Sequence, residues 1–198
     1  MFSKKKADKL TILIRILFFL IVVTAAFLAV AVARYAYREY LISSHPRNFS
    51  QIVEKYASEN DMDEYLVYAV IKTESGFEPE AVSSVGARGL MQIMPDTFEW
   101  IREYRFGGDE LVYDDMFDPD DNIRYGCRLL AYHLDYYGNV DCALAAYHSV
   151  GGAVDEWLAN AEYSPDGKTL GKIPVSDTAH YVDKVNKAYK TYLELYAQ

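Results

Sequence analysis

Residues 64–75 read EYLVYAVIKTES, and this stretch decides the fold because its apolar residues recur at helical spacing. Leu66, Val70 and Glu74 are four residues apart and therefore share one face of the helix expected here. An acid on an apolar face is costly unless it is paired, protonated or used in chemistry. Desolvation and the negative end of the helix dipole both raise the expected pKa of Glu74, as a general acid near neutral pH requires. A carboxyl group held by a structural hydrogen bond or ion pair is the alternative.

A loop punctuated by glycine follows this helix. Residues 81–95 read AVSSVGARGLMQIMP, with glycines at positions 86 and 89. Glycines allow a backbone to come close to whatever occupies an adjacent cleft. The acid and the loop together suggest a site where one carboxyl group carries out proton chemistry on an extended polymer.

The chain beyond residue 47 predicts one mainly α domain, because few of its segments alternate with the period of two that marks strands. Asp63 can cap the helix that begins at residue 64. Asp118 before Pro119 is a favourable helix start, and Gly138 is a favourable stop. Asp141 is placed to cap the helix that follows. We expect helices over residues 49–58, 64–75, 119–137, 142–148 and 178–195, and a further helix that begins at Pro95.

The amino-terminal part predicts a membrane anchor. Residues 16–33 form an uncharged apolar run of 18 residues, close to the length of a helix that spans a bilayer. The basic segment 1–15 before it favours an amino terminus in the cytoplasm. Residues 34–47 then form a stalk, and residues 48–198 form an extracytoplasmic domain. A cleaved signal peptide is the competing interpretation, since residues 29–33 offer small-residue cleavage sites, and it would export the same domain.

The charge balance argues against nucleic acid as a partner. The formal net charge is −9, and the lysines and arginines are concentrated before residue 40. Nucleic-acid binding selects basic surfaces. The four histidines show no spacing typical of metal ligands, so neither a metal nor another cofactor is expected.

The two cysteines, Cys127 and Cys142, predict separate buried thiols although the domain is exported. The turn at residues 137–139 would fold their two helices back on each other. Cys127 lies well before this turn and Cys142 directly after it. At about 1.5 Å of rise per residue, their heights differ by about 10 Å, which is too far for a disulfide.

Several ordered motifs resemble those of the soluble lytic transglycosylase (SLT) family of peptidoglycan-cleaving enzymes. The resemblance covers about residues 49–189 and implies a lysozyme-like helical fold. The matching segments are residues 70–77, around the acid; 81–95, the glycine loop; 118–123 with 143–147; and 173–185.

The resemblance implies a membrane-anchored enzyme that cuts the β-1,4 bond between N-acetylmuramic acid and N-acetylglucosamine. Glu74 would act first as acid and then as base, and the product would carry a 1,6-anhydro ring. Ordinary hydrolysis uses two carboxyl groups flanking the bond. Here one acid is well placed, and no second one matches it.

The resemblance also assigns substrate contacts residue by residue. Tyr147 would lie beside the acid and Tyr181 would line the cleft, with packing between helices as the alternative for both. The remaining contacts would come from the glycine loop: Ser83, Gln92, and Met91 or Met94, with a position in the core as the alternative for the methionines.

Three departures from the family pattern affect substrate positioning. His148 stands where asparagine is usual, and it retains hydrogen-bonding ability but can titrate near neutral pH. Val150 replaces a glycine, and Gly151 with Gly152 would restore the turn one step later. Asp177 stands where glutamate is usual.

Two other functions remain open. A lysozyme-type hydrolase would leave a reducing end, and a glycan-binding scaffold of the same fold would serve a wall-remodelling complex without strong catalysis. The intact Glu74 favours an enzyme, whereas the altered residues after Tyr147 favour the binding protein. In each case the partners are glycan strands and, through the anchor, the membrane.

Overall fold

The structure is a computed structural model of the chain, and it describes residues 2–149 and 152–197, with side chains from residue 11 onward. The chain forms two compact units, Met1–Pro46 and Arg47–Gln198.

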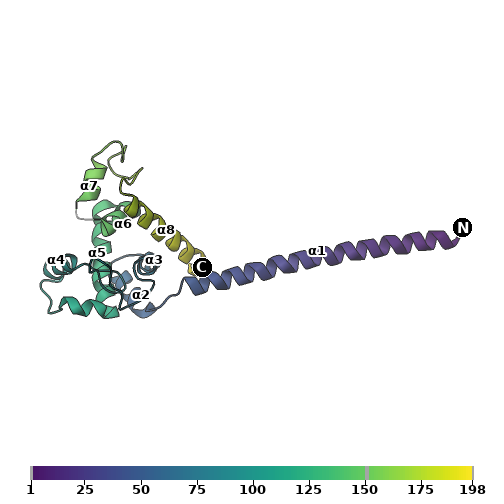
Figure 1. Cartoon of the computed structure of the whole chain (residues 1–198), viewed down its shortest axis with the longest axis horizontal. Helices are drawn as coiled ribbons and strands as arrows, with labels where there is room; N and C mark the ends of the chain where they lie inside the picture. The colour runs from purple at the N-terminus through teal and green to yellow at the C-terminus, as the bar shows by residue number, and fades with distance from the viewer. Residues whose placement is uncertain (1, 150–151, 198) are drawn as a thin grey trace. The chain divides into compact units, whose positions relative to one another are not determined.

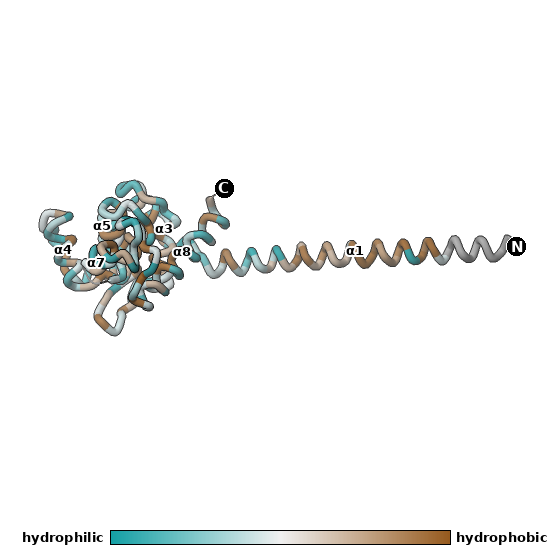
Figure 2. Tube along the Cα trace, turned by 90° about the horizontal axis from the view of Figure 1, so that it is seen from above, coloured by the Kyte–Doolittle hydropathy of each residue, from teal (hydrophilic) through white to brown (hydrophobic). Residues whose placement is uncertain are grey.

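The first unit is one long helix, α1, Phe2–Ser44 (Figure 1). Its stretch Thr11–Ser44 is long enough to cross a membrane and contains an 18-residue window with a mean hydropathy of 3.0 and no buried residue. The predicted span 16–33 lies inside α1, and the predicted stalk 34–47 is helical as far as Ser44. Hydrophobic residues follow one another along this helix without a core to cover them (Figure 2). A solvated helix would expose them at a large cost, which is why a bilayer suits this segment.

The second unit is helical, so the predicted mainly α fold is confirmed. Its described residues contain isolated bridges around Arg88 but no strand. The helices are α2 (Ser50–Glu59), α3 (Glu64–Glu74), α4 (Pro95–Arg105), α5 (Pro119–Tyr137), α6 (Val140–His148), α7 (Ala153–Leu158) and α8 (Ser176–Tyr196), with a short 3-10 helix η1 (Tyr113–Phe117).

Helix α5 forms the centre of this unit and packs against α2, α4 and α6, while α3 packs against α8 (Figure 1). The core between these helices is rich in large side chains, and Tyr68, Ile71 and Leu130 have no exposed surface. Helix α8 also packs against α6, and the predicted acid lies at the carboxyl end of α3.

Most helix ends follow the predicted caps. The Asp63 carboxylate accepts a hydrogen bond from the Tyr65 backbone at 2.8 Å, and Gly138 ends α5 in the left-handed conformation. The cap predicted for α6 was wrong. Asn139, with an extended backbone, accepts a hydrogen bond from the Cys142 backbone at 3.0 Å, so the helix begins at Val140. Asp141 instead accepts a hydrogen bond from Asn186 at 2.7 Å.

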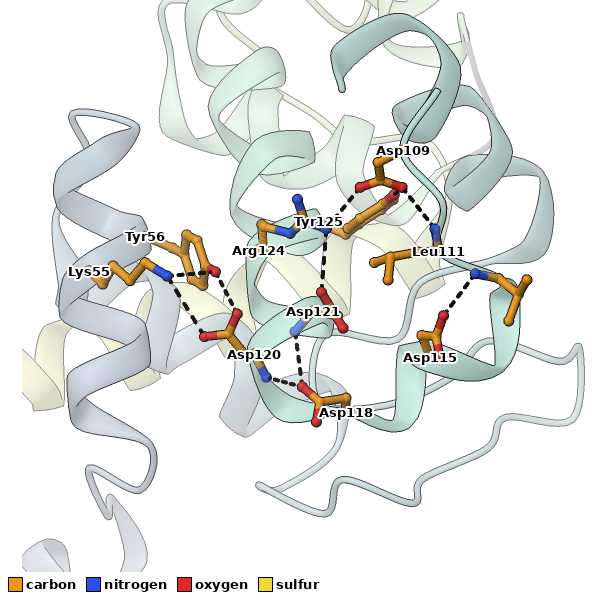
Figure 3. A network of polar contacts seen from close by, with 11 residues as sticks. Lys55, Tyr56, Asp109, Leu111, Asp115, Asp118, Asp120, Asp121, Arg124 and Tyr125 are labelled. Atoms are coloured by element: carbon orange, nitrogen blue, oxygen red, sulfur yellow. Dashed lines mark hydrogen bonds and ion pairs between the residues drawn. The ribbon is translucent and has the colours of Figure 1, made fainter. Parts of the chain in front are cut away.

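A polar network fixes α5 to the segments around it (Figure 3). Asp109 accepts hydrogen bonds from Arg124 at 2.8 Å and from the Tyr125 hydroxyl at 2.7 Å, so the loop after α4 is tied to α5. Tyr56 on α2 donates to Asp120 at 2.6 Å. These contacts fix the first turns of α5, where the glycine loop is also held.

The two cysteines are free and buried, as predicted. Cys142 donates a weak hydrogen bond to the Lys168 carbonyl at 3.7 Å. Burial raises the pKa of the Cys127 thiol, which makes it an inert part of the core.

Candidate active site

Glu74 is the last residue of α3, and its helix face is buried as its spacing predicts. Leu66 and Val70 on that face are buried in the core, whereas Glu74 is only partly covered. Burial raises the pKa of Glu74 from its ordinary value to about 7, and the Tyr181 hydroxyl opposes part of the rise. No second carboxylate among the described residues contributes to this shift. Glu74 is therefore a single carboxyl group that holds its proton near neutral pH.

Two tyrosines face this acid from different helices. Tyr147 lies on α6 and Tyr181 on α8, and burial raises the pKa of both hydroxyls, with the charge of Glu74 adding to the rise. The Tyr147 hydroxyl donates a hydrogen bond to the Met91 carbonyl at 2.8 Å. The Tyr181 hydroxyl is buried and forms no well-aligned hydrogen bond with any described residue. The hydroxyl nevertheless lies close enough to Glu74 to donate to its carboxylate, and this interaction lowers the pKa of Glu74.

The glycine loop is held against the acid by side chains of neighbouring elements. Ser75 donates a hydrogen bond to the Leu90 carbonyl at 2.8 Å, which joins the end of α3 to the loop. Gly89 has a φ of +75°, and a β-carbon there would lie 2.2 Å from both Asn122 Nδ2 and the Met116 carbonyl oxygen. Only glycine satisfies both the backbone angle and this close approach.

Asn122, on the first turn of α5, is the residue that organises the loop. It is fully buried and accepts a hydrogen bond from the Met91 backbone at 2.7 Å. Its amide donates to the Arg88 carbonyl at 3.0 Å and to the Met116 carbonyl at 2.8 Å. The sequence motif that starts at Asp118 includes this residue, but its role was missed because nothing in the spacing shows that it reaches the loop.

The loop residues predicted to contact substrate are largely engaged with the loop itself. Ser83 Oγ accepts a hydrogen bond from the Ala87 backbone at 3.0 Å. Gln92, whose φ is +51°, donates through Nε2 to the Gly89 carbonyl at 2.9 Å and to the Ala81 carbonyl at 3.2 Å. These bonds fix the curvature of the loop and leave the Gln92 side-chain oxygen as its remaining hydrogen-bonding group.

Met91 takes the core position that was the alternative to a contact with a sugar ring. The side chain has no exposed surface and packs in the core. A β-carbon on Gly126 would lie 2.3 Å from Met91 Sδ, so the glycine of α5 makes room for this side chain. Met91 serves the site through its backbone, and Met94, 36% exposed, is the methionine at the surface.

His148, the first departure from the family pattern, belongs to the cluster that Glu74, Tyr147 and Tyr181 form. Its ring stacks on Tyr181, and its Nδ1 lies 3.3 Å from Thr178 Oγ1. Nε2 lies 3.8 Å from Asp177, and burial lowers the pKa of His148 against the opposing effect of that carboxylate. The departure at Val150, with Gly151, lies outside the described residues. Gly152 has a φ of +83° directly before α7, as expected of a glycine that forms the turn.

A cavity of about 420 Å³ adjoins the cluster through Tyr147. Its walls come from α4, α5, α6 and α7. Sequence reasoning missed this cavity, although Tyr132 and Tyr136 are spaced by four residues on α5. No group of three or more metal-ligating side chains occurs among the described residues. The aromatic and acidic side chains that define the cavity are Asp96, Trp100, Tyr132, Tyr136, Tyr137 and Asp155.

Comparison with known proteins places these motifs in one family. The family described as "Transglycosylase SLT domain" matches residues 51–169. The soluble lytic murein transglycosylase of Salmonella typhimurium is 32% identical over 78% of this chain and 24% of its own length. The membrane-bound lytic murein transglycosylase C of Serratia proteamaculans is 28% identical over 76% of this chain and 48% of its own length. The chain thus spans about a quarter of the first of these relatives and about half of the second.

Solved structures agree with the sequence relatives. An inactive mutant of the lytic transglycosylase Slt from Pseudomonas aeruginosa superposes with a TM-score of 0.67 at 30% identity, over 78% of this chain and 25% of that one. The complex of the 70-kDa soluble lytic transglycosylase with bulgecin A gives a TM-score of 0.71 at 27% identity, over 80% of this chain and 26% of that one.

Proposed function

Since the chain belongs to the SLT transglycosylase family, we propose that it is a lytic transglycosylase that cleaves the β-1,4 bond between N-acetylmuramic acid and N-acetylglucosamine in peptidoglycan. One observation carries this proposal: Glu74 is a lone carboxyl group with a pKa of about 7, facing two tyrosine hydroxyls. A group with this pKa can give up a proton and take one back at neutral pH. Hydrolysis with two carboxylates would need a second acid beside Glu74. No carboxylate among the described residues contributes to the pKa shift of Glu74.

The proposed reaction uses the same carboxyl group twice. Glu74 gives its proton to the glycosidic oxygen as the bond from C1 to that oxygen breaks. The acetamido oxygen of the muramoyl sugar bonds to C1 and stabilises the cation. The C6 hydroxyl oxygen then displaces it at C1 while its proton passes to Glu74. A 1,6-anhydro ring forms, Glu74 is protonated again, and no water is consumed.

The neighbouring residues support these steps. The Tyr181 hydroxyl, which lowers the pKa of Glu74, would stabilise the carboxylate formed after the first proton transfer. Tyr147 would fix the loop beside the acid through its hydrogen bond to the Met91 carbonyl. Ser83 would shape the loop, and Gln92 would accept a hydrogen bond from a sugar through its free side-chain oxygen.

We propose that α1 anchors the enzyme with its catalytic domain outside the cytoplasm. Residues 16–33 would cross the bilayer and the basic segment 1–15 would remain inside. Residues 34–47 would form the stalk and residues 48–198 the catalytic domain. The relatives described as membrane-bound agree with a membrane location for this chain.

The decisive experiment is a digest of purified peptidoglycan by the full chain in detergent, with the fragments identified by mass spectrometry. Anhydro-muramoyl ends that are absent with Glu74→Gln would establish both the reaction and its acid. Reducing ends would make the protein a hydrolase. Absence of cleavage, with glycan binding retained in both proteins, would favour the binding scaffold.

A further inference from the structure

The cavity beside Tyr147 combines aromatic walls with carboxylate side chains that no lysine or arginine of the described lining balances. Trp100 on α4 and Tyr132 on α5 contact each other, with ring centroids 5.0 Å apart, and Tyr136 continues the row at 6.1 Å from Tyr132. Asp96 on α4 and Asp155 on α7 also line the space. The described lining residues include neither Lys nor Arg.

The lining carries negative charge at neutral pH. His133 carries the one ionisable nitrogen among the described lining residues, and burial lowers the pKa of His133 to about 4, so the ring is neutral. Asp155 lies close enough to Tyr137 to add to the rise that burial causes in the pKa of that hydroxyl. Each of the two aspartates lies in the first turn of its helix, where the dipole favours an acid.

Aromatic faces beside carboxylates are the surroundings that suit an ammonium group. An ammonium ion donates three hydrogen bonds, carboxylates only accept, and the ring faces attract a cation. The same two rings already contact a cation on another side, since the Arg105 guanidinium lies 5.1 Å from the Trp100 ring and 4.3 Å from the Tyr132 ring. Arg105 does not line the cavity, so its charge is not offered to a ligand there.

We infer that this cavity binds the free side-chain amine of a diamino acid in a peptide attached to the glycan. This inference rests on the proposed function. Tyr147 faces Glu74 and also lines the cavity, so a peptide branch on a sugar held at Glu74 can enter it. The cavity would therefore favour peptides whose side-chain amine is free over peptides in which that amine is acylated.

The test measures binding to the full-length Glu74→Gln protein in detergent by isothermal titration calorimetry. The probes are a disaccharide-tripeptide with a free side-chain amine and the same compound with that amine acetylated. Acetylation removes the charge, so we expect about three- to tenfold weaker binding, as an exposed ion pair and a cation–π contact together supply. The preference should shrink in higher salt.

Two further variants test whether the preference for the free amine arises in the cavity. Adding Asp96→Asn and Asp155→Asn should abolish the preference for the free amine while binding of the acetylated compound stays the same. Glu156→Gln, an exposed acid on the same helix outside the lining, is the matched control and should retain the preference.

Equal binding of both compounds, binding of neither, or an equal loss for both in the double aspartate variant would overturn the inference. The last result would indicate a subsite for a neutral sugar. Failure of the proposed function is recognised separately, because it would appear as absence of anhydro-muramoyl ends in the digest by the wild-type chain.

Discussion

The imidazole ring of His148 stacks on the phenol ring of Tyr181, with centroids 4.4 Å apart and planes inclined by 26°. The pair joins α6 to α8, and the Tyr181 hydroxyl in turn lowers the pKa of Glu74. The histidine that departs from the family pattern thus supports the group that faces the acid, and this relationship leads to two predictions.

Tyr181→Phe should shift the alkaline limb of the pH–rate profile to higher pH. The wild-type chain should lose activity as pH rises through about 7, since Glu74 must begin protonated. Removing the hydroxyl removes an interaction that favours the carboxylate, so the pKa of Glu74 rises and the acid stays protonated to higher pH. The measurement is kcat/KM against pH on soluble glycan strands. Tyr68→Phe, which deletes another buried hydroxyl in the core, is the matched control, and a limb that stays or moves to lower pH would contradict the argument.

His148→Ala should reproduce part of that shift, because the ring that holds Tyr181 is lost. It should also lower stability by about 0.5–1.5 kcal/mol, the contribution of an aromatic pair. His148→Phe keeps a ring for stacking and should restore the limb. Burial lowers the pKa of His148. If the pH–rate profile shows a titration that disappears in His148→Asn, its midpoint should therefore lie below the ordinary histidine pKa. A His148→Phe limb that matches His148→Ala would show that stacking is not the cause.

Glu74→Gln should stabilise the fold in a pH-dependent way. The folded-state pKa of Glu74, about 7, lies above its ordinary value of 4.5, so the folded chain holds the proton more tightly than the unfolded chain does. The wild type therefore loses stability as pH rises from about 4.5 to about 7, by at most about 3 kcal/mol, whereas glutamine does not titrate. Urea unfolding at pH 4 and pH 8 measures this. We expect the free energy of unfolding of the variant, relative to that of the wild type, to be higher at pH 8 than at pH 4. An equal difference between the two proteins at both pH values would refute the assigned pKa.

The sequence predicted those parts of the fold that depend on local interactions. Asp63 and Gly138 form the expected helix ends because a cap needs only its own turn. Asp141 was expected to cap α6, but Asn139 does so because of its extended backbone between the two helices, which spacing does not reveal. The resemblance offered Met91 or Met94 as a contact to a sugar ring, with a core position as the alternative. Met91 takes the core position because its side chain fills the space left by Gly126, a residue far along the chain.

The same distinction applies to the site. Helical spacing predicted that Glu74 shares the buried face of Leu66 and Val70. Spacing left a structural role for the acid open, and the catalytic role came from the family resemblance. The aromatic cavity could not be predicted, because Trp100, Tyr132 and Asp155 come from three helices that only the tertiary packing brings together. Residues that act through distant contacts carry no local signal.

The last prediction follows from the hydrogen bonds that attach the glycine loop to Asn122. Asn122→Ala removes three hydrogen bonds, so it should cost on the order of 3 kcal/mol. The Met91 amide and the Met116 carbonyl lose their bonds to Asn122, while the Arg88 carbonyl keeps its bond from the Ile93 backbone at 3.0 Å. Gly89→Ala should be similarly severe, because its β-carbon would meet Asn122 and the Met116 carbonyl in addition to the strain of a positive φ.

Gly86→Ala is the matched control for Gly89→Ala. Gly86 also has a positive φ, +91°, but a β-carbon there meets no atom within 4 Å, so only the backbone strain of about 1–2 kcal/mol applies. Urea unfolding of the three variants should therefore rank Gly86→Ala as the mildest. Since the loop adjoins Glu74 through Ser75 and Leu90, kcat/KM should fall in Asn122→Ala and Gly89→Ala even at temperatures where both remain folded. Equal destabilisation by Gly86→Ala and Gly89→Ala would show that strain, and not the contact with Asn122, determines the need for glycine.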